Sequence, residues 1–555
     1  ALPHFGQNRA FSFRDAPHWV QKAGFGIVLE AAVDRWSLPE KADDYNVLHV
    51  ERMVCIDGDF FAFGRNLDVL VHREVLRLGA KTFGEQLVRT FYRQNTSDCI
   101  KHFVLLRNEG ILSALSGFGV DYLWMSSKGS NMDKTLLELA LALMQAPGNT
   151  TFDIPLALPE QGLGDLETLR CLAPKVLGEA AQLGNSTTLA HMDPPTETIS
   201  WATTLWNASL NQNLLHPATS PFASGAEATC ISWLAPFFGM SGGHFCSGST
   251  LGNLTALWAA RNCKGVTRVF ASELAHNSIS KCCNMLGLQY EILPVNDDMT
   301  VQVPASGLQG SCLVLTVGTT GGGAIDPLHV HTDADWVHVD AAWAGPLRLT
   351  GKYAPLLDGI ERADSVAVSA HKMLLQPKDS AFVLFKHYND VLPSISTAGA
   401  YLTQPTVGIQ GSRSAAATVV LSYLLARGRH GVEQTICTLM RNTETLYAYL
   451  SASPHYICAV RPVTGVNVFQ HRHMCTSELL SHLPEGTFST FRYRDEDWVR
   501  SVSANPNADV EQIIHWLAEH ALDVSCKFRM PNAACVRKKQ PLEKTRGCAL
   551  TGLAR

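Results

Sequence analysis

The alternation of hydrophobic and polar residues divides the chain into zones that differ in their predicted secondary structure. Up to about residue 128, short segments alternate apolar and polar positions, as in Val50–Phe63, where Asp57–Gly58 suits a hairpin turn. A polar stretch, Gly129–Asp133, then leads into a predicted helix over Thr135–Met144. The pattern therefore predicts an amino-terminal α+β domain over residues 1–128, followed by a helical segment over residues 133–230.

From about residue 151 to residue 390, apolar runs alternate with segments of helical period. The runs include Cys312–Val317, Trp336–Val339 and Ser365–Val368. Strands that are apolar on both faces are typical of a parallel sheet covered by helices on both sides. We expect an α/β large domain over residues 231–395, a smaller α+β domain over residues 396–525 that ends in the helix Val510–His520, and a basic, mobile tail over residues 526–555.

Composition and charge narrow the function classes. With 46% hydrophobic and 17% charged residues, the 555-residue chain has the composition of a well-buried globular protein with more than one core. The formal net charge of −5 gives no electrostatic basis for binding nucleic acid or an anionic membrane. No apolar run reaches the length of a membrane span, and Val419–Ala426 is typical of a buried helix. Fifteen scattered cysteines without a repeated CxxC spacing indicate reduced thiols, and Ala1–Arg14 lacks the apolar stretch of a signal peptide, so we expect a cytoplasmic protein.

Two charged residues stand at the ends of predicted strands. Lys372 follows the strand-like stretch Asp364–Val368, at the edge of the sheet where α/β proteins place ligands. Burial there would lower the pKa of its amine and favour a Schiff base with an aldehyde. Asp340 ends the stretch His338–Val339–Asp340, where its carboxylate could keep a pyridinium nitrogen protonated. The alternative is a metal bound by His338 and Asp340, since the two side chains point to the same face of a strand.

Three further motifs are expected at the same edge of the sheet. The stretch Ser247–Gly248–Ser249–Thr250 opens a predicted helix, and the N–H groups and hydroxyls at a helix N-terminus suit a phosphate. His276 supplies an aromatic ring that could stack on a cofactor. The loop Gly318–Gly321, which contains Thr319, follows an apolar strand. Each motif is weak alone, and the order of the motifs along the chain carries the information.

This order is a phosphate turn, a stacking histidine, a Gly-Thr-Thr loop, an aspartate on a strand and a His-Lys pair. It resembles the order in the group II pyridoxal-5′-phosphate (PLP)-dependent amino-acid decarboxylases. The resemblance covers roughly residues 188–519 and includes His191–Pro194, Glu227 and Trp233–Leu234. It implies PLP as cofactor, the fold-type I (aspartate aminotransferase-like) architecture with a mixed, mostly parallel seven-stranded sheet, and a homodimer with active sites at the subunit interface. It also implies an enzyme that decarboxylates an L-amino acid to the corresponding amine.

The resemblance assigns a role to each motif residue. Lys372 would hold the cofactor as a Schiff base, Asp340 would pair with its pyridine nitrogen, and His276 would stack on its ring. Ala342 would lie beneath the ring and Thr319 near the cofactor. The phosphate would be surrounded by Ser247, Gly248, Ser249, Thr250 and His371, while Gly411 and Ser412 would reach the phosphate held by the other subunit.

The chain departs from the family pattern in places that affect the reaction. Ser369 stands where the family has the aspartate of Asp-x-His-Lys, and Ser224–Glu227 stands where the family has Thr-Glu-Leu-Glu. Between Lys372 and Gly411 the chain offers Tyr401 as a candidate catalytic residue, but no clear match to the mobile-loop tyrosine that many members use as a proton donor. Without that donor, transamination or oxidative deamination is the alternative reaction, and a scaffold without catalysis is the third hypothesis.

The substrate side chain is not specified by any charge cluster in the sequence. Arg413 and Arg500 are candidate anchors for a substrate carboxylate, because a guanidinium can grip a carboxylate with two donors. The expected partners are therefore a small amino-acid substrate and a second copy of the chain, with no nucleic acid and no membrane.

The amino-terminal zone carries a second resemblance. The stretches Val50–Leu67 and Leu78–Leu87, followed by strand-like segments up to Phe118, are similar in order to the chorismate lyases over about Leu38–Trp124. The resemblance implies a small antiparallel sheet with helices that encloses a pocket for an aromatic acid. Arg52 matches the carboxylate-binding arginine of that family, whereas Ser116 stands in place of its active-site glutamate. This favours a binding or scaffolding module over a working lyase, and a stabilising appendage to the dimer is the alternative.

Overall fold

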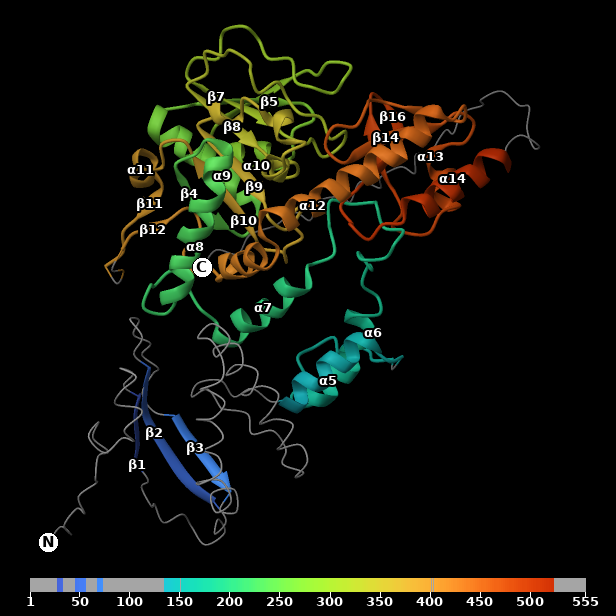
Figure 1. Ribbon diagram of the computed structural model, residues 1–555. Coiled ribbons are helices and arrows are strands. Elements are labelled where there is room, and N and C mark those ends of the chain that lie inside the picture. The colour runs from blue at the N-terminus through green and yellow to red at the C-terminus, as the bar shows by residue number, and fades with distance from the viewer. Residues whose placement is uncertain are drawn as a thin grey trace, which may run out of the picture. The chain divides into compact units, whose positions relative to one another are not determined.

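The computed structural model describes residues 27–32, 45–55, 67–72, 134–149, 151–400, 402 and 404–523 (Figure 1). The chain divides into two units between Ser127 and Lys128. In the first unit, strands β1 (Ile27–Ala32), β2 (Tyr45–Cys55) and β3 (Leu67–His72) form an antiparallel sheet in the order β1-β2-β3.

Only part of the amino-terminal prediction falls on these strands. Arg52 lies in β2 with its Cα paired to that of Glu30 in β1. Its side chain, the predicted turn at Asp57–Gly58 and the position of Ser116 lie outside the described residues. The likeness to chorismate lyases and the role of Arg52 in binding a substrate therefore stay predictions.

A seven-stranded sheet forms the centre of the second unit. Its order is β4-β10-β9-β8-β7-β5-β6, and β10 is antiparallel to both of its neighbours, whereas the other paired strands are parallel. The predicted mixed, mostly parallel α/β sheet is therefore confirmed. The strands are β4 (Gly242–Cys246), β5 (Arg268–Ser272), β6 (Gln289–Leu293), β7 (Ser311–Thr316), β8 (Trp336–Asp340), β9 (Ser365–Ser369) and β10 (Ala381–Phe385).

Helices cover both faces of this sheet, which explains why its central strands are apolar throughout. Every residue of β7, β9 and β10 is buried. On one face, α9 (Ser249–Lys264) and α10 (Ser278–Leu286) share a core with Val314 and Trp336. On the other face, α8 (Pro221–Leu234) and α12 (Ala416–Ala452) share a core with Val339 and Val368. Residues on consecutive positions of a strand point to opposite faces, so each strand contributes to both cores.

The long helix α12 leads from the large sheet to a smaller α+β domain (Figure 1). It contains the predicted buried helical stretch Val419–Ala426 and bends at Gly428, where the backbone leaves helical geometry at φ 58° and ψ −179°. An antiparallel sheet in the order β13-β14-β16-β15 then packs with α14 around Phe469 and Ile513. The elements of this domain are β13 (Tyr456–Cys458), β14 (Val466–His471), α13 (Thr476–Ser481), β15 (Ser489–Tyr493), β16 (Glu496–Val502) and α14 (Val510–Asp523).

Shorter elements complete the second unit. The predicted helix over Thr135–Met144 is α5 (Lys134–Gln145). The helices α6 and α7 lie between α5 and α8 in the chain. The predicted tail beyond Asp523 lies outside the described residues. The remaining elements are α6 (Asp165–Val176), α7 (Thr198–Leu210), η3 (Ala235–Phe238), η4 (Gly345–Leu349), η5 (Ala354–Leu357), η6 (Ile360–Arg362), α11 (Tyr388–Val391), η7 (Leu392–Ile395), β11 (Ser396–Thr397) and β12 (Thr406–Val407).

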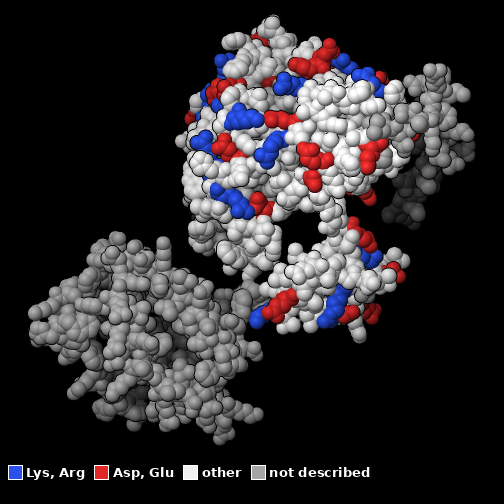
Figure 2. Space-filling view, turned by 45° about the vertical axis from the view of Figure 1, so that its right-hand side comes forward, with Lys and Arg blue, Asp and Glu red and all other residues white. Residues whose placement is uncertain are grey.

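The surface of the described residues carries charges of both signs. On the face that Figure 2 shows, lysine and arginine side chains are intermingled with aspartate and glutamate side chains. None of the helices in the described ranges combines the length and the apolar character that crossing a bilayer requires. The cysteines of residues 134–523, among them the adjacent Cys282 and Cys283, are free thiols.

Candidate active site

The motif residues meet at one edge of the large sheet. Because β4, β5, β8 and β9 run in the same direction, the segments that follow their carboxyl ends lie along the same edge. The turn before α9 follows β4, His276 follows β5, Asp340 ends β8 and Lys372 follows β9. The sheet therefore brings together residues that are separated by up to 125 positions between Ser247 and Lys372.

Lys372 is half-buried, and its surroundings disfavour the charged form of its amine. Burial is the main cause and lowers the pKa of Lys372, although the negative charges of Asp340 and Asp193 act in the opposite direction. The positive charges of Lys378 and Arg500 lower this pKa further. A larger fraction of neutral amine follows, and the neutral amine is the form that reacts with an aldehyde.

Asp340 is a buried carboxylate that retains acceptor capacity. Only 3% of the residue is exposed. Its Oδ1 accepts a hydrogen bond from the backbone N–H of Ala342 at 3.1 Å, and its Oδ2 accepts one from Nδ2 of Asn253 at 3.0 Å. A carboxylate offers about four lone-pair directions, so these two bonds leave room for a further N–H donor. A protonated pyridine nitrogen is such a donor.

The turn before α9 is shaped for an anion. Gly248 precedes the first helical residue in an extended conformation, with φ 173° and ψ 158°, and no side chain caps the helix N-terminus. The first amide groups of α9 are therefore available to a phosphate. Ser247 is held by Gln410, which accepts its backbone N–H at 3.0 Å and donates to its Oγ at 2.5 Å. Ser249 shares a hydrogen bond of 2.7 Å with Ser369, the residue that stands in place of the family aspartate.

Two histidines flank this region with their rings fixed by hydrogen bonds. Nδ1 of His371 donates to the carbonyl oxygen of Ser380 at 2.9 Å, and burial lowers the pKa of His371 to about 4. A Cβ atom on Gly248 would lie 3.9 Å from Cε1 of His371, which places this ring beside the turn. His276 accepts the backbone N–H of Ser278 at Nδ1 over 3.1 Å, and burial lowers the pKa of its ring. Both rings are therefore neutral at neutral pH.

These features fit PLP. The buried carboxylate of Asp340 suits the pyridine nitrogen, the uncapped N-terminus of α9 suits the phosphate, and the amine of Lys372 suits the aldehyde. Ala342, the small residue beside Asp340, leaves space for a flat ring. The three polar groups of the cofactor thus have three chemically matched partners along one edge of the sheet.

Other predicted site residues have local roles in the structure. Thr319 is fully buried, and its Oγ1 accepts the backbone N–H of Ala324 at 3.0 Å, so the hydroxyl shapes its own loop. Gly411 and Ser412 are exposed, and Oγ of Ser412 accepts a hydrogen bond from Nδ2 of Asn213 at 3.1 Å. The exposed side chain of Thr250 lies in the first turn of α9. Tyr401 lies outside the described residues.

The two candidate carboxylate anchors differ in their surroundings. Arg413 forms an ion pair with Glu227, and both side chains are mostly buried. Arg500 is 8% exposed and donates from Nε to the carbonyl oxygen of Thr320 at 2.7 Å. Burial lowers the pKa of Arg500 to about 10, and its charge acts on Lys372. Arg500 also donates from Nη1 to the carbonyl oxygen of Ala190 and to Oγ of Ser489, both at 3.2 Å, so both arginines are engaged within the chain. The role of Arg500 as a carboxylate anchor stays a prediction.

His338 is not placed as a metal ligand. Its Nδ1 is hydrogen-bonded to Oγ of Ser365 and its Nε2 to Oδ1 of Asn253, both at 2.9 Å. Both nitrogens of the ring are therefore engaged by neighbouring side chains. Within the described ranges, no group of three or more histidine, cysteine, aspartate and glutamate side chains is arranged to hold a metal ion.

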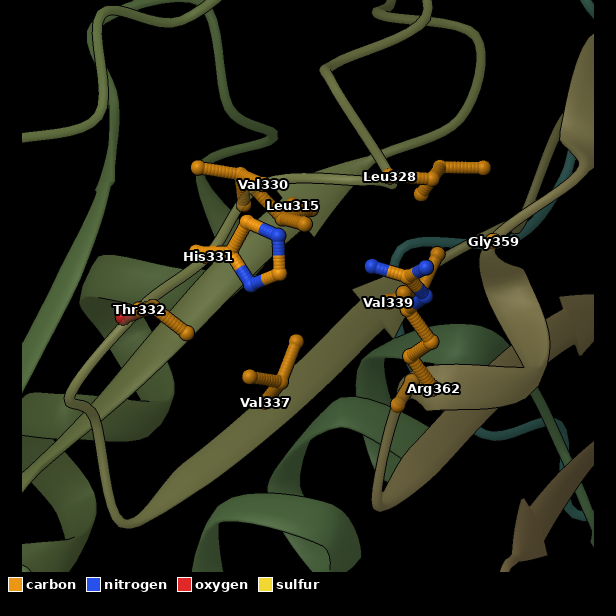
Figure 3. A pocket seen from close by; sticks show the side chains of 10 residues that line it. Leu315, Leu328, Val330, His331, Thr332, Val337, Val339, Gly359 and Arg362 are labelled. Carbon is orange, nitrogen blue, oxygen red and sulfur yellow. The ribbon is translucent and has the colours of Figure 1, made fainter.

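A cavity of about 190 Å³ lies on the other side of β8 (Figure 3). It is lined by Val337 and Val339, which point to the face of the strand opposite His338 and Asp340. Figure 3 shows His331 and Arg362 on opposite sides of this cavity. It is therefore separate from the edge where the motif residues meet.

The sequence interpretation missed residues that the structure places in the site. Asn253 lies in the second turn of α9, three residues beyond Thr250, and is 1% exposed. A polar residue on a helix face shared with Leu254 and Leu257 is the signal that points to it. Gln410 gave no such signal, because it lies 163 positions from Ser247 and no local pattern pairs the two residues.

Comparisons with known proteins show the family of this chain. Residues 181–472 match the family model described as the pyridoxal-dependent decarboxylase conserved domain. The L-2,4-diaminobutyrate decarboxylase of Rhizobium meliloti is 30% identical over 350 residues, which cover 57% of this chain and 70% of that protein. The aspartate 1-decarboxylase of Aliivibrio fischeri is 31% identical over 292 residues, which cover 41% of this chain and 53% of that protein.

Solved structures show the same fold at low sequence identity. Mouse CSAD in its apo form superposes with a TM-score of 0.60 at 20% identity, over 70% of this chain and 98% of that chain. The glutamate decarboxylase domain of a diaminobutyrate-pyruvate transaminase and L-2,4-diaminobutyrate decarboxylase from Vibrio parahaemolyticus superposes with a TM-score of 0.57 at 20% identity, over 76% of this chain and 96% of that chain. The architecture is that of the fold-type I decarboxylases.

Proposed function

The chain belongs to the pyridoxal-dependent decarboxylases, and we propose that Lys372, Asp340 and the turn before α9 hold PLP for the decarboxylation of an L-amino acid. The protein is a PLP-dependent carboxy-lyase that converts an amino acid to an amine. The observation that carries the assignment of residues is the buried carboxylate of Asp340, which keeps acceptor capacity at the same sheet edge as a lysine of lowered pKa.

The side chains act mainly by holding groups in place. When bound, the cofactor supplies an electron-withdrawing ring that accepts the electron pair left behind as CO2 departs. Asp340 would keep a proton on the ring nitrogen, because a buried carboxylate favours a positive partner. The amine of Lys372 would hold the aldehyde of the cofactor, and the first amides of α9 would hold its phosphate. Arg500, whose charge acts on Lys372, is the cation that would orient the substrate carboxylate.

The reaction is tested with a panel of L-amino acids. The relatives named above are decarboxylases of 2,4-diaminobutyrate and of aspartate, so the panel includes diamino acids, acidic amino acids and aromatic amino acids. We expect mass spectrometry to detect, for at least one member, an amine that has lost CO2 and kept its amino group. The matched control is the same protein freed of PLP, which should convert none of them.

Two results would contradict this assignment. A keto acid or an aldehyde as the main product would support transamination or oxidative deamination, the alternatives expected if Tyr401 or another donor does not return a proton. No conversion by a protein that binds PLP through Lys372 would favour the scaffold hypothesis.

We also propose that the chain forms a homodimer through the face made by α7, α8 and α12. Large apolar side chains on this face are exposed in the single chain, including Trp206 at 69%, Phe222 at 68% and Leu425 at 67%. Both α7 and α8 pack on α12, so these side chains belong to neighbouring helices. Several exposed aromatic and aliphatic side chains on adjoining elements are typical of a protein interface.

Light scattering should give the wild-type protein twice the 60.5 kDa mass of one chain. The double variant Trp206→Glu and Phe222→Glu should have the mass of one chain, because two charges would lose their hydration at the interface. The control is Met285→Glu, which places a charge on a residue of α10 that is 64% exposed on the other side of the sheet. A dimer that survives the double change would place the interface elsewhere.

A further inference from the structure

Asn253 occupies the centre of a buried hydrogen-bond network. Its Nδ2 donates to Oδ2 of Asp340 at 3.0 Å and to Oγ of Ser278 at 3.1 Å, and its Oδ1 is 2.9 Å from Nε2 of His338. The four residues are each no more than 3% exposed. The amide therefore uses both of its N–H groups and its oxygen within the network. Because the four residues are buried, water cannot readily replace any of these hydrogen bonds.

The direction of the hydrogen bonds on the β8 side follows from groups that cannot reverse their role. The indole Nε1 of Trp336 can only donate, and it does so to Oγ of Ser365 at 2.9 Å. Ser365 in turn contacts Nδ1 of His338 at 2.9 Å. If Nδ1 of His338 carried the proton, Nε2 would be an acceptor and would need an N–H group of Asn253. The amide would then turn its Oδ1 toward the carboxylate of Asp340, and two acceptors would face each other without a proton between them. The consistent arrangement has Ser365 donating to Nδ1 and Nε2 of His338 donating to Asn253.

A neutral His338 agrees with this assignment. The ring is fully buried, and burial lowers the pKa of His338 to about 4, although the charge of Asp340 acts to raise it. The amide orientation of Asn253 is thereby determined: Oδ1 faces His338, and Nδ2 faces Asp340 and Ser278.

The network continues from Ser278 to His276. The backbone N–H of Ser278 donates to Nδ1 of His276 at 3.1 Å, so Nδ1 is an acceptor and the proton of the neutral ring is on Nε2. The hydroxyl of Ser278, which accepts from Asn253, lies 2.9 Å from the same Nδ1 and donates to it. Asn253 is thus joined directly to Asp340 and through one hydroxyl to His276.

We propose that Asn253 is a positioning residue that holds the Asp340 carboxylate and the His276 ring in register with each other. The proposal rests on the proposed function in one respect: Asp340 and His276 are the residues assigned to the two sides of the cofactor, at its ring nitrogen and over its ring. A fixed separation between them matters because small displacements of groups that contact a reacting centre reduce turnover strongly. Asn253 therefore has a role distinct from that of the phosphate turn Ser247–Thr250, which opens the same helix.

The change Asn253→Asp separates this role from simple packing. It keeps the shape of the side chain and an acceptor for His338, but it removes both donors and places a second carboxyl group against Asp340. Two adjoining buried carboxyl groups cannot both be ionised easily, so the pair retains a proton to higher pH. The other titratable groups around the amide are His338 on β8, His276 and Cys282 around α10, and Lys372 after β9.

The first measurement uses the PLP-free protein and needs no activity. The shared proton means that a carboxyl group of this variant has a higher pKa in the folded protein than in the unfolded protein. Such a group contributes stability below its unfolded pKa, and this contribution is lost as the pH rises through its folded pKa. Asn253→Asp should therefore unfold at lower denaturant concentration than the wild type at neutral pH, and the difference should shrink as pH falls toward 4, near the ordinary aspartate value. The control is Asn262→Asp, at an exposed position of the same helix. This variant loses the hydrogen bond from Nδ2 to the carbonyl oxygen of Ser394, but water reaches the new carboxylate, so its difference from the wild type should not follow this course.

The second measurement is the pH profile of turnover by the PLP-loaded protein. Asn253→Asp should lower kcat by roughly 100-fold at neutral pH, and the ratio to the wild type should recover as pH falls, because the shared proton restores a donor to Asp340. Parallel profiles, together with an unfolding difference like that of Asn262→Asp, would overturn the proposal. A wild type without decarboxylase activity would contradict the proposed function and leave the unfolding result intact, so the two failures are distinguishable.

Asn253→Ser covers the case in which Asn253→Asp does not fold at neutral pH. Serine keeps one donor in place of two, so kcat should fall about tenfold, while the KM for substrate stays near the wild-type value. The control is Asn262→Ser. Equal kinetics for the two variants would also overturn the proposal.

Discussion

Replacing Lys372 with alanine should remove the visible absorption of the PLP-loaded protein and lower turnover by about 10⁴-fold or more. The reason is that Lys372 is the amine at the carboxyl edge of the sheet whose pKa burial lowers, beside the carboxylate of Asp340. A methyl group cannot capture the aldehyde. The absorption spectrum, PLP retention on gel filtration and the rate of amine formation measure the three consequences.

The attachment point can be identified directly. Borohydride reduction of the wild-type protein followed by peptide mapping should place the added cofactor mass on Lys372. The control variant is Lys352→Ala, which removes a lysine whose side chain is 62% exposed and should leave the spectrum and the turnover unchanged. Cofactor mass on another lysine would show that the reactive amine has been assigned to the wrong residue.

Replacing Asp340 with alanine should leave PLP bound but lower kcat by roughly 10³-fold or more. Lys372 and the turn before α9 still hold the aldehyde and the phosphate, whereas the ring nitrogen loses the carboxylate that keeps it protonated. Asp340 also raises the pKa of Lys372 against the effect of burial, so its loss should lower that pKa further. Steady-state kinetics and a titration of the PLP-free protein with PLP measure the two effects.

The second buried aspartate near this end of the sheet supplies the matched control. Asp326 is 1% exposed and accepts the backbone N–H groups of Val301 and Thr316 at 2.8 and 2.7 Å. Asp326→Asn should reduce stability, because one of these N–H groups would face an amide N–H, but it should change kcat only a few-fold. If Asp340→Ala retained near-normal turnover, Asp340 could not be the partner of the ring nitrogen.

Much of the fold could be predicted from the sequence because burial leaves a local pattern. The apolar runs Cys312–Val317, Trp336–Val339 and Ser365–Val368 correspond within one residue to β7, β8 and β9, since strands buried on both faces must be apolar throughout. The motif residues could be recognised because they lie at or shortly after the end of a strand, or open a helix. Because the strands are parallel neighbours, the residues at their carboxyl ends lie along one edge of the sheet.

Other features depended on the tertiary structure alone. The sequence does not distinguish Arg413 from Arg500, yet the fold pairs Arg413 with the carboxylate of Glu227, 186 positions away, and gives Arg500 only uncharged hydrogen-bond partners. Asn253 carries no local sign of its partners either, because Ser278, His338 and Asp340 lie 25, 85 and 87 positions away.

The sequence by itself therefore determined which segments are buried and which residues can carry the chemistry. The tertiary structure decided which of those residues are joined by hydrogen bonds, which form ion pairs and which are buried together. The physical reason is that periodic burial is a property of neighbouring residues along the chain, whereas hydrogen-bond partners and pKa shifts arise from groups that meet only when the sheet has formed.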